Sequence, residues 1–389
     1  MSSERTASAP VADVWSAQDT NPDAIEAALR EQLRGRHAAN QALAPARVLN
    51  LIVIVDRDWK GEIANRLEAV GRYHASRTIL CAVEDGRTTL DAVAVMSYRE
   101  PKEPGAIGVM HEHVEIDMGP EHLAGIETIV DPIVATELPT VLWSPHGHER
   151  AVSALLGMID VMLIDSDTLL DPPLALARAA EHFREAYVVD LAWLRTTPWR
   201  ERLAASFDPA ERRAELSEIT AVAIRHQSSS TASALLLAGW LAARLGWRPA
   251  PLWFDGDLAA RGTARRVASG EEGDDGDVGG EGEHGGEDEH GREGEEGEEV
   301  SIELETVAQG VPGLAGVSVR CADGFSLSLD RALGGLCARE SAPGDAERVW
   351  KVLGASRGEG GILGEGVRQA LLRDPTYGPA LAAARRFGT

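Results

Sequence analysis

The run ARVLNLIVIVD at positions 46–56 constrains the fold more than any other stretch of the chain. Its apolar residues are nearly continuous and rich in β-branched types, which is typical of a strand covered on both faces. A helical pattern follows at 59–73 and a second apolar strand at 78–83. Strand, helix and strand over about 30 residues form a βαβ unit with a right-handed crossover. The sequence therefore predicts an α/β protein with a layered mixed or mostly parallel sheet and flanking helices.

Four further segments extend the predicted sheet. Residues 91–98 and 109–118, of which the second alternates in polarity, indicate an antiparallel addition, whereas 137–147 and 159–167 are apolar runs that end in polar residues. Helical patterns, with Asn21 as the cap of the first, are expected at 22–41, 121–133 and 172–187.

Polar side chains follow the predicted strand at 137–147. Open α/β sheets bind ligands at the carboxyl ends of their strands. Trp143, Ser144 and His146 are therefore expected where a binding site would be.

The formal net charge of −24 is largely local. Residues 270–299 hold fifteen Asp or Glu and one Arg, which accounts for −14 and leaves −10 for everything else. A Gly, Glu and Asp-rich segment with almost no apolar residues is typical of disordered, solvated chain. The remainder offers no basic surface for nucleic acid.

The composition suggests a division of the chain into four parts. These are a disordered lead at 1–20, an α/β domain at 21–258, an acidic low-complexity linker at 259–299 and a smaller C-terminal α+β region at 300–389. The alternative is that the acidic tract is a loop inserted between strands of one sheet.

The C-terminal region begins with alternating segments. Those on either side of Asp323-Gly324 predict a β-hairpin, because Asp-Gly suits its tight turn. Two helices are expected near 362–372 and 375–387.

The stretch VDLAWLRTTPWRERLAASFDP at 189–209 has an unusual composition for a surface segment. It predicts a short strand, a turn, and a helix that Thr196 or Thr197 caps and that has Pro198 in its first turn. Arg and Trp are enriched in protein interface hot spots, and arginines near a helix N-terminus favour anions. The residues of interest are Trp193, Arg195, Trp199, Arg200 and Arg202. The alternative is a core pair of Trp with solvated arginines.

Several residues could contribute to a phosphate site. Hydroxyls at Ser228, Ser229 and Ser230 precede a strongly apolar helix that runs to Trp247, and such a helix start can hold phosphate. Arg77, in the junction HASR at 74–77, and His146 could join them, although a structural turn also explains the junction.

No metal or redox site is predicted. His111 and His113 share one face of a strand, but the sequence places no third ligand beside them. Cys81, Cys321 and Cys337 lack metal or disulfide spacing, and buried thiols are expected.

The chain also lacks the short motifs of common enzymes and of membrane proteins. No GxSxG, HExxH or Walker motif occurs, and no GxGxxG follows a predicted strand, so neither a catalytic set nor a cofactor is predicted. No apolar run is long enough to span a membrane, and the first residues do not resemble a secretory signal. A cytoplasmic protein is therefore expected.

Five segments in order resemble the OpcA family of glucose-6-phosphate dehydrogenase assembly proteins of actinobacteria and cyanobacteria. The resemblance covers residues 47–254 closely and the part from Val300 more weakly, and it is carried by ARVLNLIVIV, RYHASRTILCAVE, ELPTVLWSP, VDLAWLRTTPWRERLAASFD and ALLLAGWLAARLGW. Two departures are HASR, where the family more usually has HPSR, and the acidic tract.

The resemblance implies a non-enzymatic protein that binds glucose-6-phosphate dehydrogenase, promotes its active oligomer and raises its activity in the oxidative pentose phosphate pathway. Our hypothesis is that the Trp and Arg residues at 193–202 form part of the docking face. The alternative is a sugar-phosphate sensor or enzyme, in which Arg77, His146, Arg195 and the hydroxyls at 228–231 would converge on a phosphate. A third hypothesis is a scaffold whose acidic tract binds a basic partner.

Overall fold

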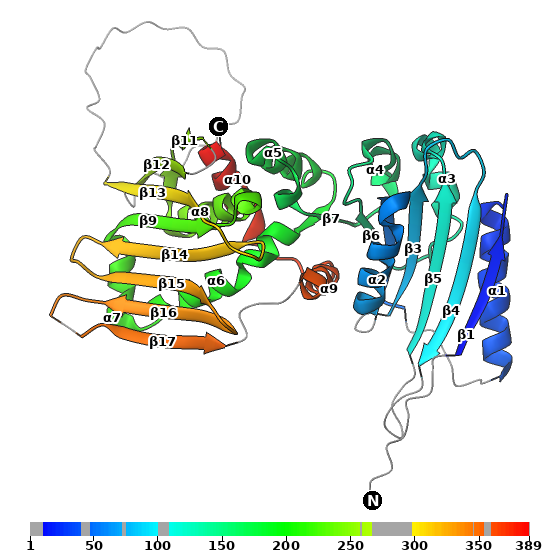
Figure 1. The fold of residues 1–389 in the computed structure, drawn as a ribbon, viewed down its shortest axis with the longest axis horizontal. Helices are drawn as coiled ribbons and strands as arrows, with labels where there is room; N and C mark the ends of the chain where they lie inside the picture. Colours follow the sequence, from blue (N-terminus) through cyan, green and yellow to red (C-terminus); the bar gives the residue numbers. More distant parts are fainter. Residues whose placement is uncertain are drawn as a thin grey trace, which may run out of the picture. The chain divides into compact units, whose positions relative to one another are not determined.

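The computed structural model describes residues 11–39, 47–71, 75–99, 109–256, 259–266, 298–344, 346–353 and 359–388. Two compact units make up the chain (Figure 1). The first comprises Met1–Arg195 and Ser356–Pro375, and the second comprises Thr196–Ala355 and Thr376–Thr389. Each unit contains one large sheet, so the predicted α/β class is confirmed.

The first unit is built on an eight-stranded sheet in the order β1-β4-β5-β3-β2-β6-β7-β8. The six strands from β5 to β8 are parallel, and β4 and β1 are antiparallel additions. Numbered along the chain, the parallel strands have the order 3-2-1-4-5-6 of doubly wound dinucleotide-binding folds. The strands are β1 Val11–Ala17, β2 Leu49–Asp56, β3 Ser76–Val83, β4 Asp91–Arg99, β5 Val109–Met118, β6 Thr140–Trp143, β7 Val161–Ile164 and β8 Tyr187–Asp190.

Helices connect and cover these strands. The capping residue predicted for α1 is confirmed, because Asn21 Oδ1 accepts a hydrogen bond of 3.0 Å from the Ala24 amide. Residues of β2 are buried from Leu49 to Val55, as expected for a strand covered on both faces. The helices are α1 Pro22–Ala39, η1 Arg57–Trp59, α2 Lys60–Gly71, η2 Pro120–Gly125, α3 Glu127–Val130, α4 Glu149–Leu155, η3 Leu156–Met158, η4 Ser166–Thr168, α5 Pro172–His182 and α9 Glu359–Gln369.

Two local predictions for this unit are wrong. Residues Val11–Ala17, placed in the disordered lead, form β1 at the sheet edge and pair with β4. The strand is held by backbone pairing and by α1, from which Gln32 donates to the Asp13 carbonyl oxygen at 3.2 Å. Composition does not reveal such contacts. The single helix expected at 121–133 is replaced by η2 and the short α3.

The second unit is built on a nine-stranded sheet in the order β10-β12-β13-β9-β14-β15-β16-β17, with β11 pairing β12. Among the described strands of this sheet, β9 and β13 are the one parallel pair. The strands are β9 Ile219–His226, β10 Trp247–Pro249, β11 Trp253–Asp255, β12 Ala259–Arg266, β13 Glu299–Thr306, β14 Leu314–Cys321, β15 Ser326–Ala332, β16 Gly335–Ser341 and β17 Arg348–Leu353.

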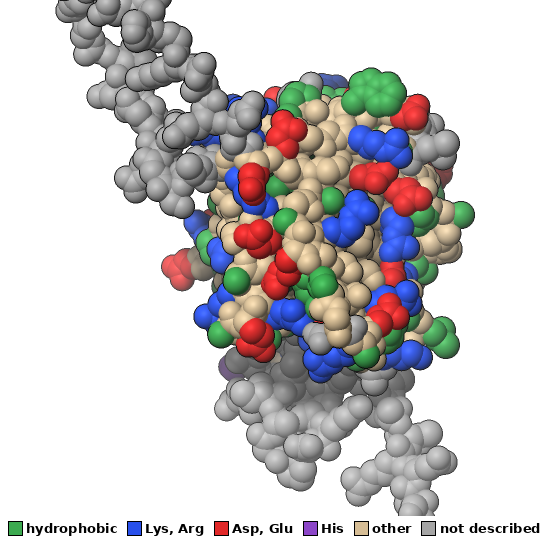
Figure 2. Space-filling view, turned by 90° about the vertical axis from the view of Figure 1, so that its left-hand side faces the viewer, with side chains coloured by type: hydrophobic (Ala, Val, Ile, Leu, Met, Phe, Trp, Pro, Cys, Tyr) green, Lys and Arg blue, Asp and Glu red, His purple; other side chains and the backbone are tan. Residues whose placement is uncertain are grey.

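Helices lie against one face of this sheet and leave the other face open (Figure 1). In β13, Val300, Ile302 and Leu304 are buried, whereas the residues between them are not. On the side of this unit seen in Figure 2, acidic and basic side chains are interspersed. The helices are α6 Leu191–Phe207, within which the two units divide, α7 Ala210–Arg213, η5 Ala214–Ser217, η6 Ser228–Ser230, α8 Thr231–Leu245 and α10 Tyr377–Gly388.

The acidic tract interrupts this sheet, as in the alternative drawn from the sequence. The strands before and after it, β12 and β13, pair with each other. Residues 259–266, placed in the linker, are therefore a strand, and 267–297 lie outside the described residues. The predicted boundaries differ from the observed units, because β9 and β12 of the predicted 21–258 domain share a sheet with the strands after Val300. The hairpin at Asp323-Gly324 is confirmed.

No helix among the described residues combines the length and the apolarity needed to cross a membrane.

Candidate functional site

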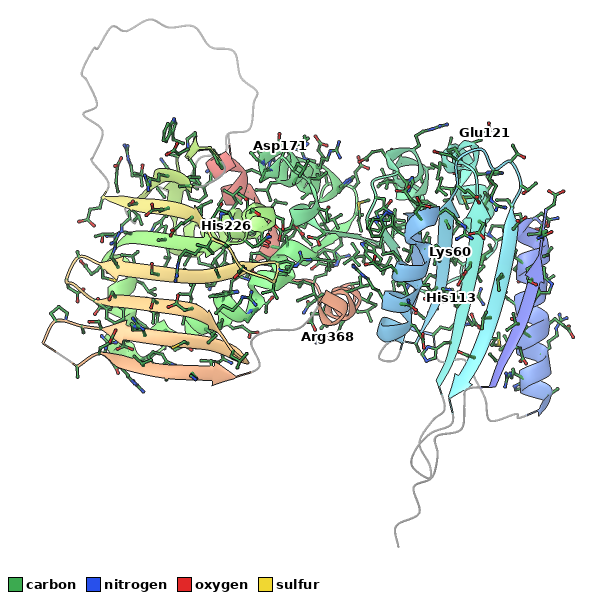
Figure 3. All side chains as sticks on the ribbon, in the orientation of Figure 1. Lys60, His113, Glu121, Asp171, His226 and Arg368 are labelled. Atoms are coloured by element: carbon green, nitrogen blue, oxygen red, sulfur yellow. The ribbon has the colours of Figure 1, made fainter. Side chains whose placement is uncertain are left out.

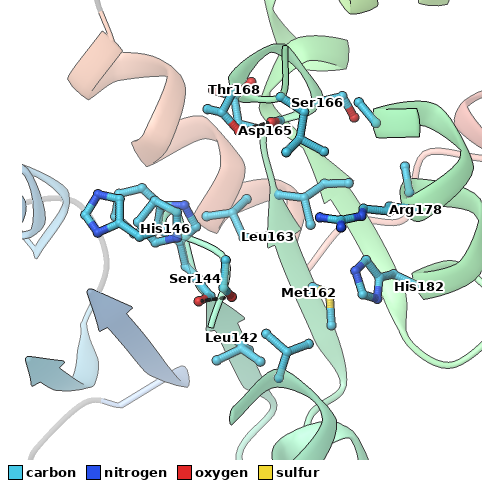
Figure 4. Close-up of a pocket in the computed structure, with 18 of the residues that line it drawn as sticks. Leu142, Ser144, His146, Met162, Leu163, Asp165, Ser166, Thr168, Arg178 and His182 are labelled. Carbon is cyan, nitrogen blue, oxygen red and sulfur yellow. Dashed lines mark hydrogen bonds between the residues drawn. The ribbon is translucent and has the colours of Figure 1, made fainter. Parts of the chain in front are cut away.

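A cavity of about 470 Å³ opens at the carboxyl ends of β6 and β7 in the first unit (Figure 4). Trp143, Ser144 and His146, expected at a strand-end site, all line it. In Figure 4, His146 lies across the cavity from Arg178 and His182 of α5. The cavity thus lies where ligands bind in open α/β sheets.

Ion pairs hold several charged groups at this edge. Arg178 lies 3.3 Å from Glu149. Arg195, predicted to face a partner or an anion, instead donates two hydrogen bonds of 2.7 Å to the two oxygens of Asp165. Such a two-point pair holds both side chains in place, and only 9% of the Arg195 side chain is exposed.

A buried carboxyl group lies at the end of β8. Asp190 accepts hydrogen bonds from the Ser166 hydroxyl at 2.6 Å, the Ser166 amide at 3.1 Å and the Ala192 amide at 2.9 Å. Burial, opposed by the Ser166 hydrogen bond, raises the pKa of Asp190 to about 6. Through these hydrogen bonds, the Asp190 carboxyl group connects β8 to η4 and to the start of α6.

The residues proposed to converge on a phosphate do not do so. Arg77 lies at the amino end of β3, where it donates to Glu112 at 2.6 Å and to the Ile133 carbonyl oxygen at 2.5 Å. His146 follows the carboxyl end of β6, which is the opposite edge of the same sheet. His74 of the HASR junction lies outside the described residues.

The hydroxyl cluster belongs to the second unit and makes local hydrogen bonds. Ser229 donates from its amide to Gln227 Oε1 at 2.7 Å, and Ser230 Oγ accepts from the Gly313 amide at 2.7 Å. Ser228 lines a shallow hollow of about 580 Å³ beside β9 and β13. These hydrogen bonds give the serines a structural role, because they stabilise the turn that connects β9 to α8.

The docking residues proposed from the sequence are mostly internal. Trp193 and Trp199 are each only 2% exposed, as the core alternative expects of the two rings, whereas Arg195, which that alternative leaves solvated, is nearly buried in an ion pair. The Trp193 indole N–H donates to Asp374 at 2.9 Å, and Arg331 stacks over Trp199 at 6.0 Å. Among the five residues of interest, Arg202 is the one that is exposed.

The helix boundary explains part of this error. Helix α6 begins at Leu191, directly after β8, so Thr196, Thr197 and Pro198 are interior and do not cap it. The arginines are therefore not at a helix N-terminus. Arg200 instead donates to the Thr196 and Thr197 hydroxyls at 2.9 and 3.0 Å.

His113 belongs to a charged cluster with α2. Its Nε2 lies 3.0 Å from Glu115, and Lys60 lies 2.8 Å from both Glu115 and Asp117 (Figure 3). The hydrogen bond from His113 and the ion pair with Lys60 lower the pKa of Glu115 to about 2. Among the described residues, two other groups bring three potential metal-ligating atoms within 4.8 Å of one another, namely Asp56, His146 and His148, and Glu215, Cys321 and Asp323.

The three cysteines are free thiols, and Cys81 and Cys321 are buried as expected. Burial raises the pKa of Cys81 to about 12. Burial, assisted by Glu215 and Asp323, raises the pKa of Cys321 to about 12. Both shifts favour the protonated thiol over the thiolate, which is the nucleophilic form.

The sequence matches two family models along most of its length. Residues 67–181 match the N-terminal domain of the glucose-6-phosphate dehydrogenase subunit family, and residues 186–381 match the C-terminal domain of the same family. The second match alone spans half of the chain.

Three cyanobacterial relatives are each provisionally named OxPP cycle protein OpcA. The protein of Synechococcus elongatus is 34% identical over 131 residues, which are 33% of this chain and 29% of the relative. Those of Synechocystis sp. and Nostoc punctiforme are 30% identical over 142 residues and 31% identical over 153 residues. These two alignments cover 36% and 38% of this chain, and 30% and 33% of the relatives. The matched part thus spans about a third of the relatives' length.

Two solved structures are similar at low identity. An oxidoreductase from Sinorhizobium meliloti has a TM-score of 0.44 at 13% identity, covering 87% of this chain and 94% of that one. An inositol dehydrogenase homolog from Azotobacter vinelandii has a TM-score of 0.38 at 10% identity, covering 88% and 86%.

Proposed function

Since the chain belongs to the OpcA family of glucose-6-phosphate dehydrogenase subunits, we propose that it is a non-catalytic, cytoplasmic protein that binds glucose-6-phosphate dehydrogenase. In this proposal it promotes the active oligomer of the dehydrogenase and raises its activity in the oxidative pentose phosphate pathway. The observation that carries the proposal is the match of the chain to both the N-terminal and the C-terminal domains of that family.

The loop after β2 supports a role without dinucleotide chemistry. In sheets with this strand order, a Gly-rich turn after the first parallel strand lets the backbone approach the pyrophosphate. Here the corresponding loop reads DRDWKG at 56–61, with a single glycine at its end. By the spacing of that Gly-rich turn, Asp56 and Asp58 stand at its first two glycine positions and Gly61 at the third. Two carboxylates would also repel a pyrophosphate.

The activator acts by differential binding. A protein that binds one state of an enzyme more tightly moves the equilibrium toward that state by its difference in affinity and no further. A tenfold preference corresponds to about 1.4 kcal/mol. The proposal therefore predicts an activation that saturates as the concentration of the activator rises.

The first experiment is a titration of glucose-6-phosphate dehydrogenase from the same organism with this purified protein, following rate against glucose 6-phosphate concentration. We expect a saturable rise in activity or a fall in apparent KM, together with a complex on a sizing column. No change in rate and no complex at micromolar concentrations would refute the proposal.

The exposed Arg202 provides a test of the docking face. Arg202→Glu reverses a charge on α6, and Arg244→Glu reverses an equally exposed charge near the end of α8 as the matched control. If α6 contributes to docking, the first variant should need more protein for half-maximal activation, whereas the second should behave as wild type. Equal behaviour of the two variants would remove Arg202 from the docking face.

A further inference from the structure

Three metal-ligating side chains meet at the point where the strand order of the first sheet reverses. Asp56 is the last residue of β2, and His146 and His148 lie between β6 and α4. Because β2 and β6 are adjacent and parallel, their carboxyl ends lie at the same edge. The chain leaves β2 toward β3 and leaves β6 toward β7, so this is the switch point at which doubly wound sheets bind ligands.

The spacing of the three side chains suits a small cation. Asp56 Oδ1 lies 3.1 Å from His148 Nε2, and Asp56 Oδ2 lies 3.6 Å from His146 Nδ1. A tetrahedral zinc ion with bonds of about 2.0–2.1 Å separates its ligand atoms by about 3.3 Å. Both distances lie close to that separation, and one ligand atom from each side chain falls within 4.8 Å of the others.

No helix cap formed by the His148 side chain explains the position of its ring. His148 is the N-cap residue of α4, yet its side chain does not cap the helix. Its Nε2 is buried and makes no hydrogen bond among the described residues, although Asp56 Oδ1 lies 3.1 Å away, where it would form an ion pair with a protonated ring. A buried imidazole nitrogen that faces a carboxylate without a hydrogen bond is an unusual arrangement in a folded protein.

The backbone at His148 also departs from the ordinary. Its φ of 50° lies in the left-handed region, which residues other than glycine seldom adopt, and it follows Gly147 at φ 89°. The imidazole of this residue lies 3.1 Å from Asp56. Residues held in such conformations are concentrated at ligand sites, where surrounding contacts maintain them.

His146 presents the required nitrogen. The Asp56 amide donates to His146 Nδ1 at 3.1 Å, so the neutral ring is in the tautomer whose lone pair points toward Asp56. The ring of Trp59 packs against this imidazole with centroids 5.7 Å apart. A bound ion would take over the Nδ1 lone pair from the amide.

We propose that Asp56, His146 and His148 form a binding site for a divalent transition-metal ion of the zinc class. Two imidazole nitrogens and one carboxylate favour zinc or ferrous iron over magnesium or calcium, which prefer oxygen ligands. Three protein ligands leave at least one coordination position for water or a ligand oxygen. This inference is independent of the proposed function.

The test uses the full chain after treatment with a chelator and its removal. Co²⁺ is added as an optical probe of the site, and Zn²⁺ is then added as a competitor. We expect saturable binding of Co²⁺, with visible absorption bands that Zn²⁺ abolishes. Asp56→Asn and His148→Ala should each weaken Co²⁺ binding at least tenfold, since even changes to groups that only orient a ligand cost about 10–100-fold. His182→Ala, which removes an imidazole from the opposite wall of the cavity, is the matched control and should stay within about twofold of wild type.

Circular dichroism checks that each variant is folded. If His148→Ala fails to fold, Asp56→Asn decides, because the Asp56 side chain is 53% exposed and its replacement is isosteric. Absence of saturable Co²⁺ binding to the wild-type chain would overturn the proposal. So would unchanged affinity in the folded ligand variants, or an equal loss in His182→Ala.

Discussion

The two sheets of this protein differ in how many of their faces are covered. In the first unit, β2 and β6 are buried along nearly their whole length. In the second unit, β13 alternates between buried residues and residues that are exposed or half-buried, and β15 begins with an alternation of half-buried and buried residues. A strand of the second sheet can therefore carry polar side chains on its uncovered face, whereas β2 and β6 of the first sheet have no such face. β2 carries its one charged residue, Asp56, at the strand end, whereas β13 carries Glu299, Glu303 and Glu305 along its length.

Polar groups within each sheet show this difference. Asn50 lies inside β2 and is fully buried, and its side chain hydrogen-bonds the Ala135 amide at 2.9 Å and the Ala135 carbonyl oxygen at 3.0 Å. On the open face of the second sheet, Arg225 of β9 pairs with Asp330 of β15 across Gly316 of β14. The pair reaches across because Gly316 has no side chain, since a Cβ there would lie 2.2 Å from the Arg225 guanidinium.

The largest expected effect is a core truncation in the doubly covered sheet. Ile54→Ala removes a fully buried side chain from β2 and should lower the free energy of unfolding by about 4 kcal/mol. Ser318→Ala, on the open face of β14, should change it by less than about 0.5 kcal/mol. Urea unfolding of both variants measures the contrast. Equal losses would show that the second face of the nine-stranded sheet is also covered.

The next effect depends on pH and concerns the buried end of β8. Burial raises the pKa of Asp190 from 3.8 to about 6, so between pH 4 and 6 the folded state holds a proton that the unfolded state has released. The protonated group stabilises the fold fully below pH 4. Its contribution to the free energy of unfolding then falls by about 3 kcal/mol between pH 4 and 6. Asp190→Asn should lack this fall. Thermal midpoints of the variant and the wild type, compared from pH 4 to 7, should therefore shift in favour of the variant, and a constant difference would contradict the assignment.

A smaller loss is expected on the covered side of the second sheet. Gly239 of α8 packs against α10, where a Cβ would lie 2.3 Å from the Ala380 carbonyl oxygen and 2.7 Å from the Ala384 amide nitrogen. Gly239→Ala should cost about 2 kcal/mol because two helix backbones must separate. Gly364→Ala in α9, with nothing within 4 Å, should be neutral or slightly stabilising. Thermal unfolding of the two variants gives the comparison.

The smallest effect belongs to the open face. Gly316→Ala also creates a close contact, but with the ends of two flexible, half-exposed side chains, Arg225 and Asp330. We expect a loss of about 1 kcal/mol or less, because the ion pair can move into solvent. Thermal unfolding measures this variant as well, and a loss equal to that of Gly239→Ala would show that the open face is as constrained as the covered one.

The sequence by itself determined those features that depend on residues close to one another along the chain. The periodicity of 46–56 and of the strands after Val300 predicted buried and alternating strands, because side chains on a strand face opposite sides in turn. Asn21 and Asp323-Gly324 predicted a helix cap and a hairpin, because both interactions close within a few residues. Trp143, Ser144 and His146 were placed at a strand end by the same local pattern.

Only the tertiary structure decided which distant residues meet. Trp193 and Trp199 have a composition equally suited to a core or an interface, and packing buried both. Arg77 lies at the beginning of β3 and His146 follows the end of β6. Because the two strands run in the same direction, the residues lie at opposite edges of the sheet. Asp56 and His148 are far apart in sequence, yet the adjacency of β2 and β6 brings them to 3.1 Å. Residue patterns specify which surfaces are apolar, whereas strand order and direction fix the distances between polar groups.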